Sequence, residues 1–382
     1  MTPEQLKLVE KFIDEKSSVV ALKTGDAIVA AAVDALQNER KKLPSYFNAR
    51  IVVDKISFQQ STSEQVAQSR NFPGGSLAID LTMGLGVDSL YLSKIYDKVI
   101  SVEIDPSKAA TAKLNFQTLG ANNIEVICSS AEEFIAGFDG VADLVFIDPA
   151  RRGDKGQKVH ALQDCAPNII EIMPRVNEIS QSVAVKLSPL FDVAELFNIF
   201  GDNIEVETVS VKGECKDVVM KMGAIARPEI LSLTVLKNSG DSPVRLAFSA
   251  EKTKLNGTLE LCDAKYIHVP DVTFVKSRTT GKYMSQSYPN FTYLIGSHLF
   301  TAEKLADFIG RSFKIYEVGE YNPKSLKRML GELGIKTATL YHRDFPYSSE
   351  LLYKKLGLKE GSDCSLFFGR AAGELYFAIS LK

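Results

Sequence analysis

Short apolar runs alternate with amphipathic stretches through the middle of the chain. Runs typical of buried strands occupy residues 76–81, 98–103, 123–128, 142–147 and 181–187. The segments between them carry apolar residues at helical spacing, at 88–95, 106–118, 131–137, 158–177 and 190–199. This alternation predicts an α/β fold in which crossover helices cover both faces of a parallel sheet.

Two further apolar runs, near residues 204–211 and 216–222, are separated only by a short turn that contains Gly213. Strands joined by so few residues pair antiparallel, because a parallel pair needs a long crossover connection. We therefore expect five parallel strands followed by an antiparallel hairpin in the same sheet.

The first 72 residues have the pattern of a helical segment. Residues 2–5, TPEQ, form a capping box with proline at the first helical position, so a helix should begin there. A second amphipathic helix, ending before Pro44, is predicted by the spacing of Ile28, Ala31, Ala32 and Leu36.

The C-terminal part has a different pattern, and Arg227-Pro228 is the predicted boundary before it. Strand signals at 230–236 and 243–248 lead into an irregular polar stretch at 276–290. The last seventy residues alternate again, with strands predicted at 312–318, 337–342, 364–369 and 375–381 and helices at 323–333 and 347–356. This βαβαββ module resembles a binding appendage more than a second nucleotide fold.

Composition excludes several classes of protein. The 382 residues hold 45 Lys and Arg against 47 Asp and Glu, which excludes a uniformly basic nucleic-acid binder. The five Cys form no CxxC pair, and the four His are scattered, so no metal site is expected and the thiols should be reduced, as in the cytoplasm. The longest apolar stretch, 27–36, is broken by Asp34 and is shorter than the ~18 residues of a membrane span.

The strongest chemical signal is the segment LAIDLTMGLGVDSLYLS at 77–93. A strand ends in Asp80, and Gly84 and Gly86 form a tight turn into a helix, where a ligand can approach the backbone closely. The next strand ends in Glu103, at the distance along the chain at which an acid binds ribose hydroxyls. The alternative is that the glycines only turn the chain and Glu103 is solvated.

The acids around this turn indicate which nucleoside binds. A nicotinamide fingerprint would have a third glycine, where this chain has Ser89, and Asp80 and Asp88 would repel its pyrophosphate. S-adenosylmethionine instead brings an ammonium and a sulfonium, which acids attract. This favours a methyl donor over the cofactor of an oxidoreductase, with Asp88 itself interpreted as a helix cap.

A second signal is DLVFIDPARRG at 143–153. Asp148 ends the fourth strand, at the edge of the sheet where ligands bind, and Pro149 keeps the chain extended there. A carboxylate and a turned carbonyl can hold an amino group in line with an electrophilic methyl, and positioning supplies most of the rate of such a transfer. The alternative is a turn in which Asp148 caps locally.

These motifs resemble those of class I S-adenosylmethionine-dependent methyltransferases. FQQSTSEQVAQSRN at 58–71 and RDFPYSSELLYKKLGLKEGSD at 343–363 are similar to segments of bacterial members that have a C-terminal THUMP-like domain. The resemblance implies a Rossmann-like sheet and the domains 1–72 (helical), 73–225 (methyltransferase), 226–308 (connecting α+β, ferredoxin-like) and 309–382 (THUMP-like). Since THUMP domains bind RNA, it also implies an RNA substrate.

The resemblance also implies roles for individual residues. The positions that would bind S-adenosylmethionine are Asp80, Thr82, Gly84, Gly86, Glu103, Ile104, Ser130, Ala131 and Asp148. Asp148, Pro149 and Lys186 would be catalytic, and Arg151, Arg152 and Glu214 would bind the substrate. Many relatives place an acid where this chain has Ser129-Ser130, so adenine would be held by Ser130 and backbone groups. Amino-group methyltransferases often carry an aromatic residue where this chain has Ala150-Arg151-Arg152, and an arginine can stack on a base or grip phosphate.

Two alternatives remain open. Asp148, Lys186 and Glu214, with Lys42 as a candidate fourth member, are similar to the set used by ribose 2′-O-methyltransferases, in which a lysine of lowered pKa activates the hydroxyl. The other alternative is an RNA-binding protein that binds the donor without turnover.

The near-neutral total charge is an average over unlike parts. Residues 71–223 hold 13 basic and 22 acidic residues, a balance suited to a cationic donor, whereas residues 311–360 hold 10 and 6. Four basic side chains also lie within residues 151–158, close to the Asp-Pro loop. Contacts to phosphate need only such local patches, so the composition is compatible with RNA binding.

Overall fold

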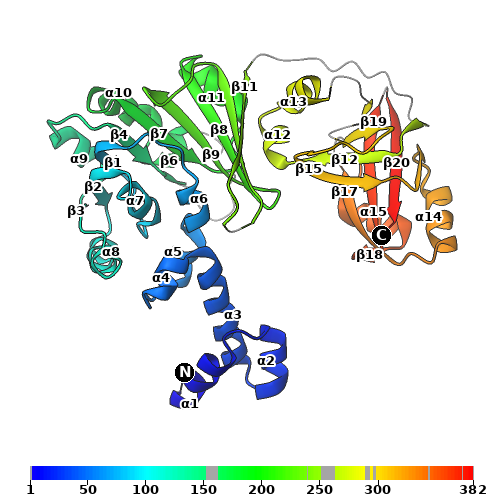
Figure 1. Cartoon of the computed structure of the whole chain (residues 1–382), viewed down its shortest axis with the longest axis horizontal. Coiled ribbons are helices and arrows are strands. Elements are labelled where there is room, and N and C mark those ends of the chain that lie inside the picture. The colour runs from blue at the N-terminus through cyan, green and yellow to red at the C-terminus, as the bar shows by residue number, and fades with distance from the viewer. Residues whose placement is uncertain are drawn as a thin grey trace. The chain divides into compact units, whose positions relative to one another are not determined.

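The structure, a computed structural model, describes residues 2–151, 162–238, 240–250, 263–288, 293–295, 298–342, 345–371 and 373–381 (Figure 1). The chain forms two compact units. The first unit comprises Met1–Val209 and Lys216–Pro228, and the second comprises Ser210–Cys215 and Glu229–Lys382. In the described ranges, no helix combines the length and the hydropathy needed to cross a membrane.

The first unit is built on a mostly parallel sheet with the strand order β8-β9-β7-β4-β1-β2-β3. Its strands are β1 (Gly75–Asp80), β2 (Tyr96–Glu103), β3 (Ile124–Cys128), β4 (Leu144–Ile147), β7 (Ser182–Leu187), β8 (Ile204–Val211) and β9 (Glu214–Gly223). β1 pairs in parallel with β2 and β4, and β4 pairs in parallel with β7. β9 runs antiparallel to β7, with Leu187 opposite Val218, so the expected fold class is confirmed.

Crossover helices follow the parallel strands, as the apolar periodicity predicts. They are α7 (Val87–Leu92), α8 (Pro106–Thr118), α9 (Ala131–Gly137), α10 (Ile169–Glu178) and α11 (Val193–Phe200). The helix expected over 158–177 begins only at Ile169, because the Asn168 side chain caps it there; residues 158–161 lie outside the described ranges.

The N-terminal segment is helical and has more helices than expected. It contains α1 (Pro3–Phe12), α2 (Ser17–Thr24), α3 (Ala27–Lys42), α4 (Pro44–Asn48), α5 (Lys55–Gln60) and α6 (Glu64–Gln68). The capping box before α1 is confirmed. The predicted apolar face of α3 is correct only in part, because Ala32 and Leu36 pack against the core of this segment but Ile28 is 57% exposed. The fully buried residues of α3 are Val29, Ala30 and Val33.

The chain from Leu43 to Ser69 packs directly onto the Gly84–Gly86 turn. Its apolar side chains share a core with Met83, Val87 and Leu90. The buried Glu64 carboxylate accepts hydrogen bonds from Ser45 and from the Tyr91 hydroxyl of α7, at 2.6 to 2.8 Å. These contacts hold the N-terminal segment against the turn on which a ligand is expected.

In the second unit, β10 (Ile230–Leu236) and β11 (Val244–Ser249) pair antiparallel. A four-stranded sheet follows, in the order β13 (Tyr293–Ile295), β14 (His298–Thr301), β12 (Tyr266–Pro270) and β15 (Gly310–Lys314). The short helix α12 (Val272–Lys276) ends where the stretch expected to be irregular, 276–290, begins. Helix α13 (Thr280–Ser287) lies within that stretch, so the expectation is wrong there. The apolar face of α13, Tyr283 and Met284, is buried against β10 residue Leu233.

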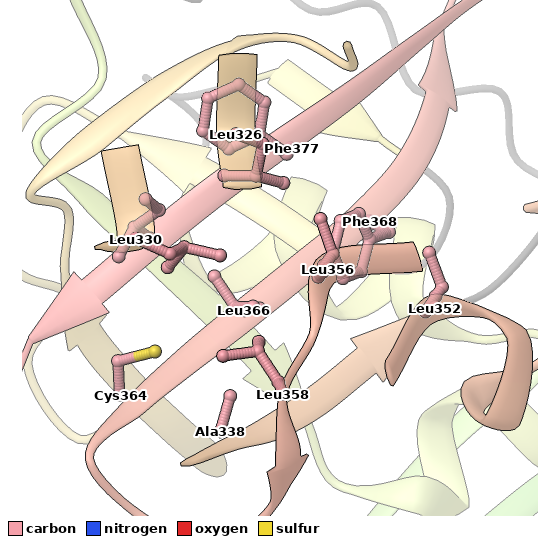
Figure 2. Close-up of a cluster of buried hydrophobic side chains, with 11 residues drawn as sticks. Leu326, Leu330, Ala338, Leu352, Leu356, Leu358, Cys364, Leu366, Phe368 and Phe377 are labelled. Carbon is pink, nitrogen blue, oxygen red and sulfur yellow. The ribbon is translucent and has the colours of Figure 1, made fainter. Parts of the chain in front are cut away.

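The C-terminal five-stranded sheet has the order β16-β20-β19-β17-β18. Its strands are β16 (Glu317–Glu320), β17 (Thr337–His342), β18 (Lys359–Glu360), β19 (Cys364–Ala371) and β20 (Glu374–Leu381), with helices α14 (Pro323–Glu332) and α15 (Ser349–Leu356). The two helices bury leucines against this sheet, and Figure 2 shows the resulting core.

The single strand expected over 312–318 is in fact two strands in two sheets. The Ile315 amide donates to Lys265, next to β12, whereas the Tyr316 amide donates to Ile379 in β20. Consecutive amides of an extended chain point in opposite directions, so one short stretch can join both sheets.

Candidate functional site

The turn after β1 is shaped by two glycines with left-handed backbone angles, φ 55° at Gly84 and φ 86° at Gly86. The Gly84 amide donates to Glu103 Oε2, and the Asp105 amide donates to Glu103 Oε1, both at 2.9 Å. Glu103 is only 9% exposed, so it is not the solvated acid of the alternative interpretation. A carboxylate has about four acceptor positions, so Glu103 can still accept two ligand hydroxyls.

Gly86 and Gly84 make a matched pair for testing this turn. A Cβ on Gly86 would lie 2.4 Å from Phe116 Cζ, whereas a Cβ on Gly84 would meet only Thr82 O, at 4.0 Å. We expect Gly86→Ala to lower the free energy of unfolding by about 3 kcal/mol and Gly84→Ala by about 1 kcal/mol, since only the former adds overpacking to backbone strain. Urea unfolding of both variants measures this; equal losses would contradict the account.

Asp80 lies beneath the turn and is almost completely buried, at 1% exposure. Its carboxylate accepts a hydrogen bond from the Ser89 hydroxyl at 2.6 Å and one from the Thr82 amide at 3.1 Å. Burial raises the pKa of Asp80 to about 7, and the nearby carboxylates of Asp88 and Asp148 add to this rise. A cation bound nearby would favour the ionised form and would reverse the shift.

Asp88 is not the helix cap that the sequence suggests, because Gly86 occupies the N-cap position of α7 and the Asp88 side chain points elsewhere. Its carboxylate accepts the Thr62 hydroxyl at 2.5 Å and Arg70 Nε at 2.7 Å. Arg70 in turn donates to Asp217 at 3.1 Å, and its guanidinium lies 5.0 Å from the ring of Phe146. The Arg70 side chain is only 7% exposed, so this is a buried ion-pair network.

Arg70 and Asp217 are site residues that the sequence analysis missed. Asp217 is next to Val218, which pairs with Leu187 at the carboxyl end of β7. It is therefore the β9 acid that reaches the network, whereas Glu214 is exposed and belongs to the second compact unit. A signal for Asp217 exists in hindsight, since it directly precedes the buried apolar run of β9.

Asp148 and Lys186 form an ion pair at the carboxyl ends of β4 and β7. Their side chains are 33% and 11% exposed, so the pair is partly open to solvent. The Asp148 amide donates to the Thr82 hydroxyl at 2.6 Å, which ties this loop to the turn after β1. Thr82 therefore fixes Asp148 relative to the glycine turn.

The protonation of this pair follows from its surroundings. Burial raises the pKa of Asp148, and the Lys186 ammonium opposes that rise. Burial lowers the pKa of Lys186, but the carboxylates of Asp148, Asp217 and Asp88 outweigh it, so the net shift is upward. Lys186 is thus a stable ammonium rather than a lysine of lowered pKa.

Lys42 is the lysine near this site whose pKa is lowered. Burial, followed by repulsion from Lys186 and Lys216, lowers the pKa of Lys42 to about 8. Its ammonium donates to the backbone carbonyls of Phe58 and Gln59 and lies 4.8 Å from the Phe58 ring.

Together these side chains form a charged cluster with an excess of acid. We use this name for two cations and four carboxylates: Arg70, Lys186, Asp80, Asp88, Asp148 and Asp217. Buried carboxylates in excess are costly unless a cation joins them or they take up protons. The cluster is therefore matched to a positively charged ligand.

The other predicted site residues are distributed around this cluster. Ile104, directly after Glu103, is 70% exposed and offers an apolar surface. Ser130 caps α9 by accepting the Glu133 amide at 3.2 Å, and Ala131 is buried beneath it. Pro149 is half-buried. The Arg151 side chain and all of Arg152 lie outside what the structure describes.

That the histidines and cysteines have no catalytic or metal-binding role stays a prediction. His268 is completely buried, where it hydrogen-bonds Ser312 and Thr301, and burial lowers its pKa to about 4. Of the five cysteines, the four that the structure describes form no disulfide, and Cys262 lies outside the described ranges. Within those ranges, no three acids, histidines or cysteines are grouped as metal ligands.

Comparison with known proteins adds independent evidence. A family model described as THUMP domain-like matches residues 310–379. An uncharacterized S-adenosylmethionine-dependent methyltransferase of Mycobacterium tuberculosis is 24% identical over 84% of this chain and 85% of its own length. Trimethylguanosine synthase of Schizosaccharomyces pombe is 31% identical over 44% of this chain and 75% of its own.

One relative is covered only in part. An uncharacterized RNA methyltransferase of Thermosynechococcus vestitus is 28% identical over 36% of this chain, which spans 32% of that protein's length. In fold, a crystal structure from Porphyromonas gingivalis W83, assigned as a methyltransferase, superposes with a TM-score of 0.76 at 20% identity, over 99% of this chain and 98% of that one. The chain therefore belongs to the class I S-adenosylmethionine-dependent methyltransferases, takes its methyl group from S-adenosylmethionine, and carries a THUMP-like domain at its C-terminus.

Proposed function

We propose that the protein methylates RNA and that Asp148 positions the accepting group. The observation that carries this proposal is the hydrogen bond between the Thr82 hydroxyl and the Asp148 amide. It connects the glycine turn, which would bind the donor, to the carboxylate that would bind the acceptor. Transfer of a methyl group depends mainly on such relative positioning.

The donor fits the residues around the turn. Glu103 has acceptor positions left for the two ribose hydroxyls, and the exposed side chain of Ile104 can cover one face of the adenine. Backbone at Gly84 and Gly86 allows close approach, and the excess of acid in the charged cluster favours the cationic methionine end. The donor supplies a methyl group that its sulfonium makes electrophilic.

The protonation of Asp80 makes donor binding depend on pH. Because its pKa is raised to about 7 and a cationic donor favours the ionised form, affinity should fall as pH drops through neutrality. We expect S-adenosylmethionine to bind less tightly by up to roughly tenfold per pH unit below the pKa of Asp80. Calorimetry across this range tests the expectation. Asp80→Asn should bind weakly with a flat pH profile, and an unchanged profile in that variant would rule out Asp80 as the titrating group.

At the acceptor side, Asp148 would accept a hydrogen bond from an N–H of the incoming amino group. This orients the nitrogen lone pair toward the methyl group, and the backbone carbonyl beside Pro149 can accept a second N–H. The Lys186 ammonium favours the ionised form of Asp148 against the effect of burial and holds the carboxylate in place. After transfer, the nitrogen loses one proton, which Asp148 or solvent can take up.

The choice of RNA as substrate rests on relatives and on charge. Several relatives are named RNA methyltransferases, and one is a tRNA/tmRNA (uracil-C(5))-methyltransferase of Saccharophagus degradans. The C-terminal region is THUMP-like, and residues 311–360 hold 10 basic against 6 acidic side chains. Arg151 and Arg152 would contact the RNA beside the transferred group.

A ribose 2′-hydroxyl is the second candidate acceptor, and Lys42 is the observation that favours it. A lysine with a pKa of about 8 can take a proton from a hydroxyl far more readily than the Lys186 ammonium can. In this version Lys42 is the base, and the pair Asp148–Lys186 orients the ribose.

Mass spectrometry of digested RNA from a deletion strain and its parent tests the proposal and separates the two acceptors. Loss of a base-methylated nucleoside in the deletion strain supports an amino group as the methyl acceptor. Loss of a 2′-O-methylated nucleoside supports the hypothesis that Lys42 activates a ribose hydroxyl. If every methylated nucleoside keeps its abundance, RNA is not the substrate.

A further inference from the structure

The second unit contains a cavity of about 510 Å³ that plays no part in the site described above. It is bounded by the turn between β8 and β9, the end of β10, and residues of β12, α12, β15 and β17. Apolar side chains such as Val235, Leu236 and Ile309 form part of its wall. This volume is in the range of sites that hold small molecules of nucleotide size.

The charge of the cavity favours an anion. Lys212, Lys237 and Arg311 line it, with His298 and His342, against the single carboxylate of Asp271. The turn holds Lys212 in a left-handed conformation, φ 53°, with its amide bonded to Leu236 O at 2.8 Å. Lys237 and Arg311 are exposed, so their charged ends are available to a phosphate.

One wall of the cavity has an arginine plane that lies over an aromatic ring. The Arg311 guanidinium lies 5.0 Å from the centre of the Tyr341 ring. Tyr341 stacks on Phe367 with centroids 4.8 Å apart and planes inclined by 12°, which fixes the orientation of its ring. Rigid aromatic rings and arginine planes are the surfaces on which unpaired bases stack.

Asp271 adds a hydrogen-bond acceptor to the apolar part of the cavity. It is 7% exposed, and its Oδ1 accepts the Ser210 hydroxyl and both the amide and hydroxyl of Thr273, at 2.8 to 3.0 Å. In the described ranges no donor is bonded to Oδ2. A carboxylate held this firmly, with one oxygen left over, can accept the exocyclic amino group of a base.

We propose that this cavity binds one unstacked nucleotide of an RNA strand. The base stacks on the Arg311 guanidinium, which the Tyr341 ring supports from behind, its amino group donates to Asp271 Oδ2, and Lys212 and Lys237 contact the phosphate. The cavity prefers cytidine to uridine, because uridine presents a carbonyl where cytidine presents the amino group. Assigning the strand to the methylated RNA rests on the proposed function; the binding itself does not.

Fluorescence anisotropy of the full chain with labelled tetracytidylate and tetrauridylate tests this proposal. We expect the cytidine strand to bind about tenfold more tightly, since one good base contact gives discrimination of that order. In Asp271→Asn, which keeps the Oδ1 acceptor and offers an amide N–H in place of Oδ2, the preference should disappear or reverse. Lys237→Ala and Arg311→Ala, both at exposed positions, should weaken the binding of both strands to the same extent. Lys354→Ala on α15 should leave the affinity for both strands unchanged.

Each other outcome counts against the proposal. Equal affinity for the two strands in the wild-type protein would mean that no base is recognised. Binding unchanged in Arg311→Ala and Lys237→Ala would place the RNA elsewhere. Binding of cytidine monophosphate without binding of the tetranucleotide would identify a site for a free nucleotide. If the deletion strain keeps all its RNA methyl groups but this discrimination holds, the proposed function fails and the nucleotide site stands.

Discussion

Asp148→Asn is expected to lower the rate of methyl transfer by roughly 10³-fold, the scale on which a positioned acid or base contributes. The amide keeps the shape of the side chain and can still accept a hydrogen bond from Lys186, so the fold should persist. It removes the charge that would orient the amino group of the substrate. Its own NH₂ can only donate a hydrogen bond, whereas the substrate amino group needs an oxygen that accepts one. The rate is measured as transfer of a labelled methyl group to RNA.

The matched measurement is binding of S-adenosylhomocysteine, which should change by no more than about threefold, because the glycine turn and Glu103 are untouched. Loss of product binding together with activity would mean that Asp148 acts only by supporting the donor site. Retention of activity would remove Asp148 from the acceptor side altogether. Thr82→Val should lower the rate more than it weakens donor binding, because it deletes the hydrogen bond to the Asp148 amide.

Arg70→Met is expected to give the largest loss of stability, about 3 to 5 kcal/mol, the cost of breaking a buried ion pair from one side. Arg70 is the shared partner of Asp88 and Asp217, which are 8% and 5% exposed. The substitution therefore leaves two buried carboxylates without the guanidinium that both of them contact. The network also joins the segment before β1 to α7 and β9, so donor binding should weaken as well.

The pH dependence distinguishes this effect from simple loss of packing. Arg70 helps to lower the pKa of Asp88 against the effect of burial, so its charge stabilises the fold above the ordinary pKa of an aspartate. Without Arg70 the carboxylates should protonate more readily. The loss in free energy of unfolding caused by Arg70→Met should therefore be larger at about pH 8 than at about pH 5. A deficit independent of pH would contradict the electrostatic explanation. Arg40→Met, which breaks the exposed pair with Asp14, is the control and should have little effect.

Much of the first unit can be predicted from the sequence because the central strands of its sheet, such as β4 and β7, are buried on both faces. Each appears as an uninterrupted apolar run such as Leu144–Ile147, and parallel order then follows from the helices between them. The same reasoning places Asp80, Glu103 and Asp148 at one edge of the sheet. Their roles depend only on strand ends and on the glycine turn, which are local features.

The features that sequence reasoning missed depend on contacts distant along the chain. Arg70 and Asp217 are 147 residues apart, and no local pattern pairs a given arginine with a given acid. The exposed side of α3 depends on how α1 and α2 pack against it, since alanines and valines lie on more than one face. Helix α13 has few apolar residues, and its two large buried side chains acquire partners only in the second unit.

The protonation of the two lysines is likewise a tertiary effect. The resemblance to the 2′-O-methyltransferase set calls for one lysine of lowered pKa, but three aspartates from α7, β9 and the loop after β4 raise the pKa of Lys186. The lowered pKa belongs to Lys42, at the end of α3 in the N-terminal segment. Residue type and position on a strand do not determine such shifts, because they arise from the charges that the fold collects around each group.

The most direct test of the account is transfer of a labelled methyl group from S-adenosylmethionine to RNA prepared from a strain that lacks this protein. The account predicts label in RNA with the wild-type chain, and its near absence with Asp148→Asn although that variant still binds S-adenosylhomocysteine. Label found in protein or small molecules rather than RNA, or equal label with both chains, would contradict it.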